Sequence, residues 1–201
     1  RRGPQFKALD WVDDILSNKL PSCKRARQAC KRFRADLKRA GTDQFPYVFD
    51  MEASEHICAF LEALPHIKGK WAQRGETLKL IGWQAFLVGQ IGGWRHMETG
   101  LRRFRTAYIE VPRKNGKSTL LSGVGLYFLT VDDEPGAEVY SAAASTHQAR
   151  IVFDATRVMA LNGKVDGVPL ASLLDLDIEQ HKIKTSDPAA VFQPVASQTK
   201  S

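Results

Sequence analysis

The fold of this chain is decided by one stretch near its middle, Ile109-Glu110-Val111-Pro112-Arg113-Lys114-Asn115-Gly116-Lys117-Ser118-Thr119. Arg105 to Val111 is rich in β-branched and aromatic residues, which predicts a strand. Ser118 to Thr130 is apolar and predicts a helix. A tight loop joins the two and closes on Gly-Lys-Ser-Thr. A strand, a tight loop and a helix in this order are the context that a phosphate-binding loop requires.

The residues of this loop suit a triphosphate. Backbone N–H groups of the loop and of the first helical turn would face the phosphates, where the helix dipole adds about half a positive charge. Gly116 lets the backbone approach closely because it has no Cβ. We predict that Lys117 reaches the β and γ phosphates and that the Ser118 hydroxyl binds Mg²⁺.

The loop departs from the usual pattern GxxxxGK[ST] at one position. Val111 stands where the first glycine would be. An ordinary strand–turn–helix corner with a surface lysine is the alternative interpretation. That alternative must place three cations in one tight loop, where they repel one another unless an anion lies among them. The three are Arg113, Lys114 and Lys117.

A second candidate site residue lies about 25 residues before the loop. Gly82-Trp83-Gln84 begins a stretch, Gln84 to Ile91, that predicts a helix. A glutamine amide can both donate and accept, so it can contact N6 and N7 of adenine. Beside a phosphate-binding loop, Gln84 is therefore predicted to contact the adenine base.

The acidic strand that such an ATPase needs is not evident. Its aspartate would hold Mg²⁺ through water and its glutamate would orient the attacking water. The best candidate after Thr119 is Leu173 to Asp177, which is short, lies in a polar region and lacks a flanking strand pattern. The chain stops at Ser201, directly after a predicted strand. We interpret it as an N-terminal fragment that ends before the acidic strand and is inactive alone.

The first 68 residues predict a helical segment. Apolar residues at helical spacing mark helices at 6–16, 23–40 and 53–64, with a loop at 42–49. Ser22 is the predicted N-cap of the second helix and Gly41 its C-terminal stop. Cys23 and Cys30 share the apolar face of that helix, so core packing accounts for both. Pro65 closes the third helix.

The chain changes character at 68–76, which is polar and holds two glycines. We place a boundary there, with an N-terminal helical segment at 1–68 and an ATPase domain at 69–201. A short extended stretch at 77–80 is followed by strands at 105–111 and 137–143, helices at 118–130 and 148–159, and a hairpin-like pair at 180–185 and 190–195. This alternation predicts an α/β fold with a parallel central sheet covered by helices.

The composition is that of an ordinary soluble protein, with 43% apolar and 25% charged residues. No apolar run approaches the ~20 residues of a membrane span, and the N-terminus lacks the apolar core of a signal peptide. Three scattered cysteines and unclustered histidines argue against a disulfide framework and a structural zinc site. A cytosolic setting is the expectation.

The net charge of +7 is unevenly distributed. Lys24 to Arg39 holds eight basic residues and one acid, and a smaller basic cluster comprises Arg102, Arg103 and Arg105. Basic surfaces of this kind favour polyanions. The alternative is that the first cluster is a solvated helix face, and the sequence leaves both interpretations open.

These residues together resemble the large terminase subunit of tailed bacteriophages, of the HK97-like kind. The resemblance is carried by Cys30 to Leu37, Ala59 to Glu62, Pro65 to Gly69, Trp83-Gln84, Gly93 to Arg95, Gly100 to Arg105, Pro112 to Thr119, Val139 to Ala143 and Gln148 to Arg150. The Arg-Lys-Asn-Gly-Lys-Ser form of the loop, without the leading glycine, is typical of that family.

The resemblance implies a helicase-like P-loop ATPase of the additional-strand class, preceded by a helical segment. Its cofactors are ATP and Mg²⁺, with Lys117 and Arg113 in catalytic roles and Ser118 on the metal. Gly82 departs from the proline usual before Trp-Gln. The residues that the resemblance assigns to nucleotide binding are Gln84, Arg113, Lys114, Asn115, Gly116, Lys117, Ser118 and Thr119.

The resemblance further implies a motor that uses ATP to drive double-stranded DNA into procapsids, with a nuclease domain C-terminal to this chain. Its partners would be double-stranded DNA, the portal protein, the small terminase subunit and further copies of itself in a ring, with no membrane. It would work in the host cytoplasm, docked on the portal. The trans-acting arginine would lie beyond Ser201, with Arg150 a weaker candidate whose alternative role is a salt bridge on its own helix.

Two other functions fit part of the pattern. A small-molecule kinase has the same loop, but it usually keeps the first glycine and places the loop near its N-terminus. A basic DNA-binding structural domain could use the loop merely to grip a phosphate. Nucleotide binding discriminates among these classes.

Overall fold

The computed structural model describes residues 4–132 and 134–197, which form two compact units. The first unit combines the chain up to Ala59 with Lys79–Glu110, and the second combines Phe60–Leu78 with Val111 onward. The predicted boundary between residues 68 and 69 stays a prediction. Within the described ranges, none of the helices has the length and apolar character needed to cross a bilayer.

The first unit is mainly helical. Its elements are α1 (Pro4–Leu16), α2 (Lys24–Arg39), β1 (Tyr47–Phe49), the greater part of α3 (Met51–Ala63), α5 (Gly82–Gly93) and β2 (Trp94–His96). β1 and β2 pair antiparallel, with Phe49 opposite Trp94. The core is largely aromatic because α2 turns Phe33 edge-on to Phe49, Phe86 and Trp94. Such edge-to-face pairs add to the free energy of burial and fix how the helices pack.

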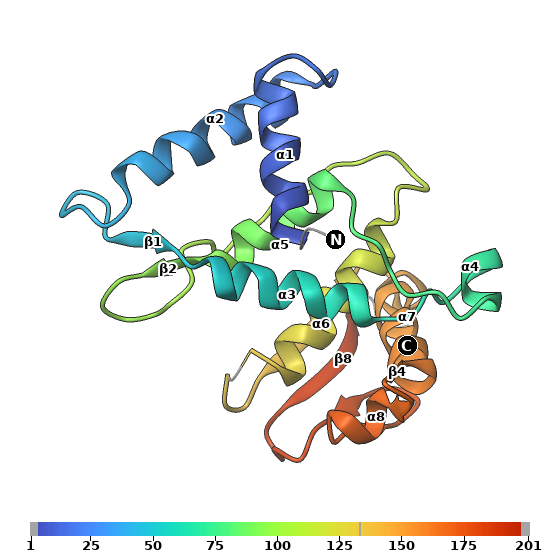
Figure 1. The fold of residues 1–201 in the computed structure, drawn as a ribbon. Helices are drawn as coiled ribbons and strands as arrows, with labels where there is room; N and C mark the ends of the chain where they lie inside the picture. Colours follow the sequence, from blue (N-terminus) through green and yellow to red (C-terminus); the bar gives the residue numbers. More distant parts are fainter. Residues whose placement is uncertain (1–3, 133, 198–201) are drawn as a thin grey trace. The chain divides into compact units, whose positions relative to one another are not determined.

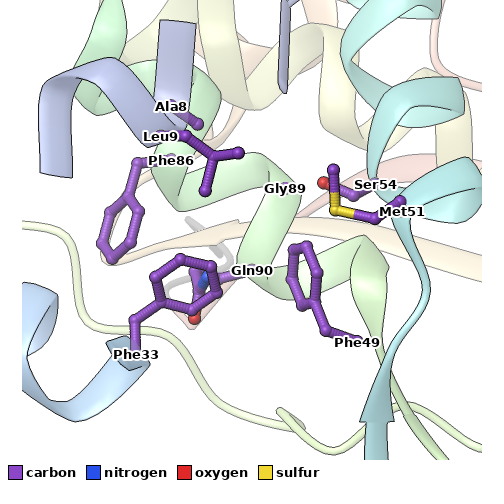
Figure 2. A pocket seen from close by; sticks show the side chains of 9 residues that line it. All are labelled: Ala8, Leu9, Phe33, Phe49, Met51, Ser54, Phe86, Gly89 and Gln90. Atoms are coloured by element: carbon purple, nitrogen blue, oxygen red, sulfur yellow. The ribbon is translucent and has the colours of Figure 1, made fainter. Parts of the chain in front are cut away.

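A small cavity lies inside this first unit. Figure 2 shows the side chains around it, which come from α1, α2, α3, α5 and the end of β1. The lining is almost entirely apolar, with Phe33, Phe49 and Phe86 among its walls. It contains none of the predicted phosphate-binding residues, so this cavity is a packing feature of the helical core.

The second unit is built on a mixed sheet. Its elements are α4 (Gly69–Gln73), α6 (Lys117–Thr130), β3 (Glu138–Ala143), α7 (Thr146–Asn162), β4 (Lys164–Val165), β5 (Val168–Pro169), α8 (Leu170–Leu173), β6 (Asp177–Ile178), β7 (Ile183–Lys184) and β8 (Val191–Ala196). The strand order is β3-β8-β7-β6, and β4 pairs separately with β5. β3 and β8 are parallel, with Glu138 opposite Val191, whereas β8 and β7 are antiparallel, with Phe192 opposite Ile183.

Helices α6 and α7 cover this sheet, and Figure 1 shows both beside β8. Phe153 of α7 packs edge-on against Phe192 of β8, with ring centroids 5.6 Å apart, and both side chains are buried. β3, α7 and β8 form one parallel strand–helix–strand crossover, so the predicted α/β character is confirmed. The predicted parallel central sheet is not seen as such, because β7 and β6 add to the sheet in antiparallel pairs. The predicted hairpin of 180–185 with 190–195 is also confirmed as β7 and β8.

The strand predicted at 105–111 is wrong. This segment has no strand assignment and pairs with no strand of the described chain, and Tyr108 is 87% exposed. Strand propensity reports how well side chains fit a pleated, half-buried surface, so it cannot hold a segment that has no neighbour to supply ladder hydrogen bonds. The stretch at 77–80 is likewise not a strand, although Leu78 donates its N–H to the Leu64 carbonyl.

Two details of the predicted α2 helix are also wrong. The N-cap is Cys23, whose Sγ accepts from the Ala26 N–H at 3.4 Å, whereas the Ser22 hydroxyl accepts from Arg27. Cys23 is therefore exposed, and only Cys30 is in the core. Burial raises the pKa of the Cys30 thiol to about 11, against the opposing effect of Arg27 and Arg34, which suits an inert packing residue.

Other boundaries move by a few residues. α5 extends beyond 84–91 and α7 beyond 148–159, and the loop predicted at 42–49 ends in β1. Gly41 has φ 76° and follows α2 as the predicted stop. Helix ends depend on local caps, which apolar spacing does not record.

Candidate phosphate-binding site

The loop before α6 has the backbone of an anion-binding turn. Lys114 has φ 69° and Gly116 has φ 74°, while Asn115 between them does not have a positive φ. Alternation of left-handed with other conformations is typical of nests, in which successive N–H groups converge on an anion. Asn115 braces the turn, because its amide donates to the carbonyls of Pro112 (3.2 Å) and Arg113 (3.3 Å).

The start of α6, like that of α5, has no side-chain cap on its first turn. Side-chain oxygen or sulfur atoms cap α2 (Cys23), α3 (Asp50) and α7 (Ser145), whereas in α5 the Gln84 side chain accepts from the N–H of the N-cap residue. The N-cap of α6 is Gly116, which has no side chain to cap the helix. The first N–H groups of a helix have no intrahelical partner. Those of α6 are therefore open to an anion, in a position where the helix dipole also favours negative charge.

Three cations lie at this opening. Arg113, Lys114 and Lys117 are all exposed, and none of them pairs with a carboxylate of the described chain. Ser118 is half-buried and is the second residue of the helix. The loop thus offers concentrated positive charge, backbone donors and a hydroxyl, which is the chemistry that a phosphate and its metal ion require.

The loop rests on a rigid support. The Ser122 hydroxyl lies 2.7 Å from the Ser118 carbonyl and 3.0 Å from the Val152 carbonyl of α7. Thr156 of α7 lies 3.1 Å from the Ser122 carbonyl in return. Both side chains are fully buried. Buried hydroxyls that are satisfied in this way fix one helix against another, so the start of α6 is held in place before any ligand arrives.

The comparisons with known proteins agree with this geometry. Residues 82–201 match the family described as the terminase large subunit, ATPase domain. The chain belongs to this family. Among solved structures, the large terminase of bacteriophage HK97 is similar, with a TM-score of 0.57 and 20% sequence identity over 74% of this chain. The match covers 28% of that terminase, so this chain spans little more than a quarter of its length. No curated protein matches the chain.

In this terminase domain Gln84 has a local structural role. Its Oε1 accepts from the Ile81 N–H at 3.1 Å and so closes the first turn of α5. The amide nitrogen of Gln84 remains the group that could donate to a base. The predicted adenine contact therefore stays a prediction, and it now rests on the amide nitrogen.

The departure at Gly82 has a steric reason. A Cβ on Gly82 would lie 2.5 Å from Cβ of Trp11 and 2.8 Å from its Cγ, because α1 packs closely across the start of α5. The Trp11 ring also stacks at a tilt on Phe86, with centroids 5.2 Å apart. Trp11 therefore occupies the space that a larger residue at position 82 would need.

We expect Gly82→Pro to destabilise the chain by about 1–3 kcal/mol, the usual cost of overpacking. The backbone is not the obstacle, since proline is favoured at the first position of a helix. Urea unfolding of the single variant, of Trp11→Ala and of the double variant gives the measurement. The double variant should be more stable than the sum of the two single losses, and strict additivity would contradict the steric explanation.

The acidic candidate at 173–177 leads into a strand at the edge of the sheet. Asp177 begins β6, the edge strand farthest in order from β3, and Asp175 lies in a turn with φ 51°. Across the described residues, no group of three His, Cys, Asp or Glu side chains is placed to bind a metal ion. The predicted binding of a metal ion by Ser118 stays a prediction.

Arg150 forms the salt bridge expected on its own helix. Its guanidinium pairs with Asp154 at 3.1 Å, and it also lies 3.0 Å from Nδ1 of His181. Nearby, Arg157 donates to the Glu179 carbonyl at 3.1 Å. The two arginines thus tie α7 to the β6–β7 turn.

One structural pair was missed by sequence reasoning. Asp36, the lone acid of α2, is 2% exposed and accepts from Arg103 at 2.7 Å and from Arg39 at 2.7 Å. The Arg103 guanidinium also lies over the rings of Phe45 (4.6 Å) and Trp94 (5.3 Å). The signal was available, since Asp36 follows Cys30 and Phe33 at helical spacing on the buried face. Arg103 is thereby engaged within the protein.

Proposed function

We propose that the loop at 113–119 binds ATP with Mg²⁺ and that this chain is the nucleotide-binding part of a DNA-packaging motor. The observation that carries the proposal is the uncapped start of α6 beneath Arg113, Lys114 and Lys117. A helix start without a side-chain cap, next to three cations that pair with no carboxylate of the described residues, costs stability unless an anion satisfies both. The family supports a P-loop ATPase fold for this region.

Each residue of the loop then has a task. Lys117 holds the β and γ phosphates, Arg113 contacts the γ phosphate, and Ser118 holds the metal ion, which when bound offsets the charge developing on the phosphates. Gly116 lets the backbone approach, and Gln84 contacts adenine through its amide nitrogen. Backbone N–H groups complete the phosphate contacts, contributed by Lys114, Asn115 and Thr119.

The motor itself is the wider proposal. Hydrolysis would move the helical segment and so drag duplex DNA into a procapsid, using contacts to phosphates that are independent of sequence. We propose copies of the protein in a ring on the portal protein, the small terminase subunit as a partner, and a nuclease domain on the C-terminal side. Because it would act with these partners, we propose that the protein works in the host cytoplasm.

Calorimetric titration with nucleotides tests the first step. We expect Mg²⁺-ATP to bind the 201-residue chain, and AMP, which lacks the β and γ phosphates, to bind at least about tenfold more weakly, because those phosphates make the charge-assisted contacts. Equal affinity for AMP and ATP, or no binding of ATP, would contradict the proposal.

Turnover by the same sample is expected to be negligible, because no carboxylate pair of the described chain is placed at the loop. Phosphate release over hours, compared with a blank without protein, is the measurement. Rapid release that disappears in a Lys117 variant would show that a catalytic carboxylate lies within this chain.

A further inference from the structure

The cations of α2 follow a seven-residue repeat. Adjacent basic pairs recur at Lys24-Arg25, Lys31-Arg32 and Lys38-Arg39. Seven residues of α-helix rise about 10.5 Å and complete nearly two turns, so the three pairs form one stripe about 21 Å long. The stripe faces away from the core, because the buried residues Cys30, Phe33 and Asp36 lie on the opposite side of the helix.

Two kinds of cation can be distinguished on α2. Arg34 pairs with Asp13, Arg39 pairs with Asp36, and Arg27 donates to Ser22, so these arginines serve the fold. The three lysines of the stripe, at positions 24, 31 and 38, are exposed and pair with no carboxylate of the described chain.

The structure joins the two basic clusters that lie more than 60 residues apart in the sequence. Arg32 lies over the Phe104 ring at 5.3 Å, and Arg103 pairs with Asp36. Both contacts are within the first unit. The exposed Arg105 follows Phe104 directly in the chain, so positive charge continues from α2 onto a second segment. On the other flank of α2, Asp13 pairs with Arg34 and offsets its charge. The uncompensated positive charge therefore lies on the stripe and on the side of Arg105.

We propose that Lys24, Lys31, Lys38 and Arg105 form a contact surface for the phosphate backbone of duplex DNA; this deepens the proposed function and rests on it. Duplex DNA presents one negative charge per about 1.7 Å of its axis, so a stripe of this length faces several phosphates at any register. Contacts to phosphates alone carry no sequence preference, as translocation of any DNA requires.

Other polyanions fit less well. A basic helix that binds a lipid surface inserts its apolar face, but here that face is buried, with Cys30 0% and Phe33 3% exposed. Proteins that hold single strands stack bases on exposed aromatic rings. The only aromatic residue of α2 is the buried Phe33, and Arg32 covers Phe104.

Fluorescence anisotropy with a labelled 30-base-pair duplex (about three helical turns) tests the proposal across a series of salt concentrations. The variant Lys24→Gln/Lys31→Gln/Lys38→Gln removes three charges. A matched control, Lys68→Gln/Lys70→Gln/Lys164→Gln, removes three charges from exposed lysines of the second unit. We expect the stripe variant to lose at least about tenfold in affinity and to reduce the slope of log affinity against log salt by about 2.7, and the control to change little.

The outcomes separate this inference from the proposed function. ATP titration of each variant confirms the fold, and Lys31→Gln alone provides a milder change with a slope reduced by about 0.9. Three results would contradict the proposed surface. The stripe variant could bind DNA like the unmodified chain, or both triple variants could lose the same DNA affinity. The unmodified chain could also bind anionic vesicles but not the duplex. If the variants still bind ATP in those cases, the proposed nucleotide site is not contradicted.

Discussion

Lys117→Ala is expected to weaken nucleotide binding strongly while the fold stays intact. The side chain is exposed and pairs with no carboxylate of the described chain, so its removal costs the folded state little. A charged hydrogen bond to phosphate contributes about 1.5–3 kcal/mol, which corresponds to a loss of about 10- to 150-fold in ATP affinity. Calorimetry with Mg²⁺-ATP measures the loss, and circular dichroism checks the fold.

The matched control for this variant is Lys164→Ala. Lys164 is also exposed but lies in β4, away from the start of α6. It should bind ATP like the unmodified chain. Unchanged ATP affinity in Lys117→Ala would reject the phosphate-loop assignment, and with it the motor.

Arg103→Ala is expected to cost about 3–5 kcal/mol in the free energy of unfolding. Asp36 is 2% exposed, so loss of its Arg103 partner leaves a buried charge with incomplete compensation. The cation–π contacts with Phe45, Trp94 and Phe104 are lost as well. Urea unfolding followed by tryptophan fluorescence measures the change.

Two further variants test whether the stability lost in Arg103→Ala comes from the buried charge of Asp36 or from packing. Arg39→Ala removes the other partner of Asp36, but Arg39 is 55% exposed, so a loss of only about 0–1 kcal/mol is expected. Replacing the pair with apolar residues, as Asp36→Leu/Arg103→Met, should recover much of the stability lost in Arg103→Ala. A double variant as unstable as the single one would show that packing, and not the buried charge, dominates.

The sequence predicted best those features that depend on a single local property of the chain. Apolar spacing located α2, α6 and α7, and Gly116 with its Lys-Ser-Thr continuation located the loop, because glycine tolerance and helix dipoles are local properties. The pairing of Asp36 with Arg103 depends on a contact across 67 positions, which no local pattern specifies. The role of Gly82 was hidden for the same reason, because Trp11 lies far from it in the sequence.

The failure at 105–111 has a different cause. Its residues have strand propensity, but a strand is a property of at least two segments, and propensity describes only one. The capping error at Ser22 arose because serine is the commoner N-cap, whereas the backbone places Cys23 at that position. The predicted roles of Gln84 and of the loop residues 113–119 all stay predictions.

The unpaired segment at 105–112 has a practical consequence for handling the protein. No strand of the described chain pairs with its backbone, and Tyr108 is exposed, so one copy can offer this backbone to the same segment of another copy. Natural β-proteins avoid such open edges because they seed aggregation. Concentrated samples should precipitate through this stretch sooner than the favourable net charge would suggest.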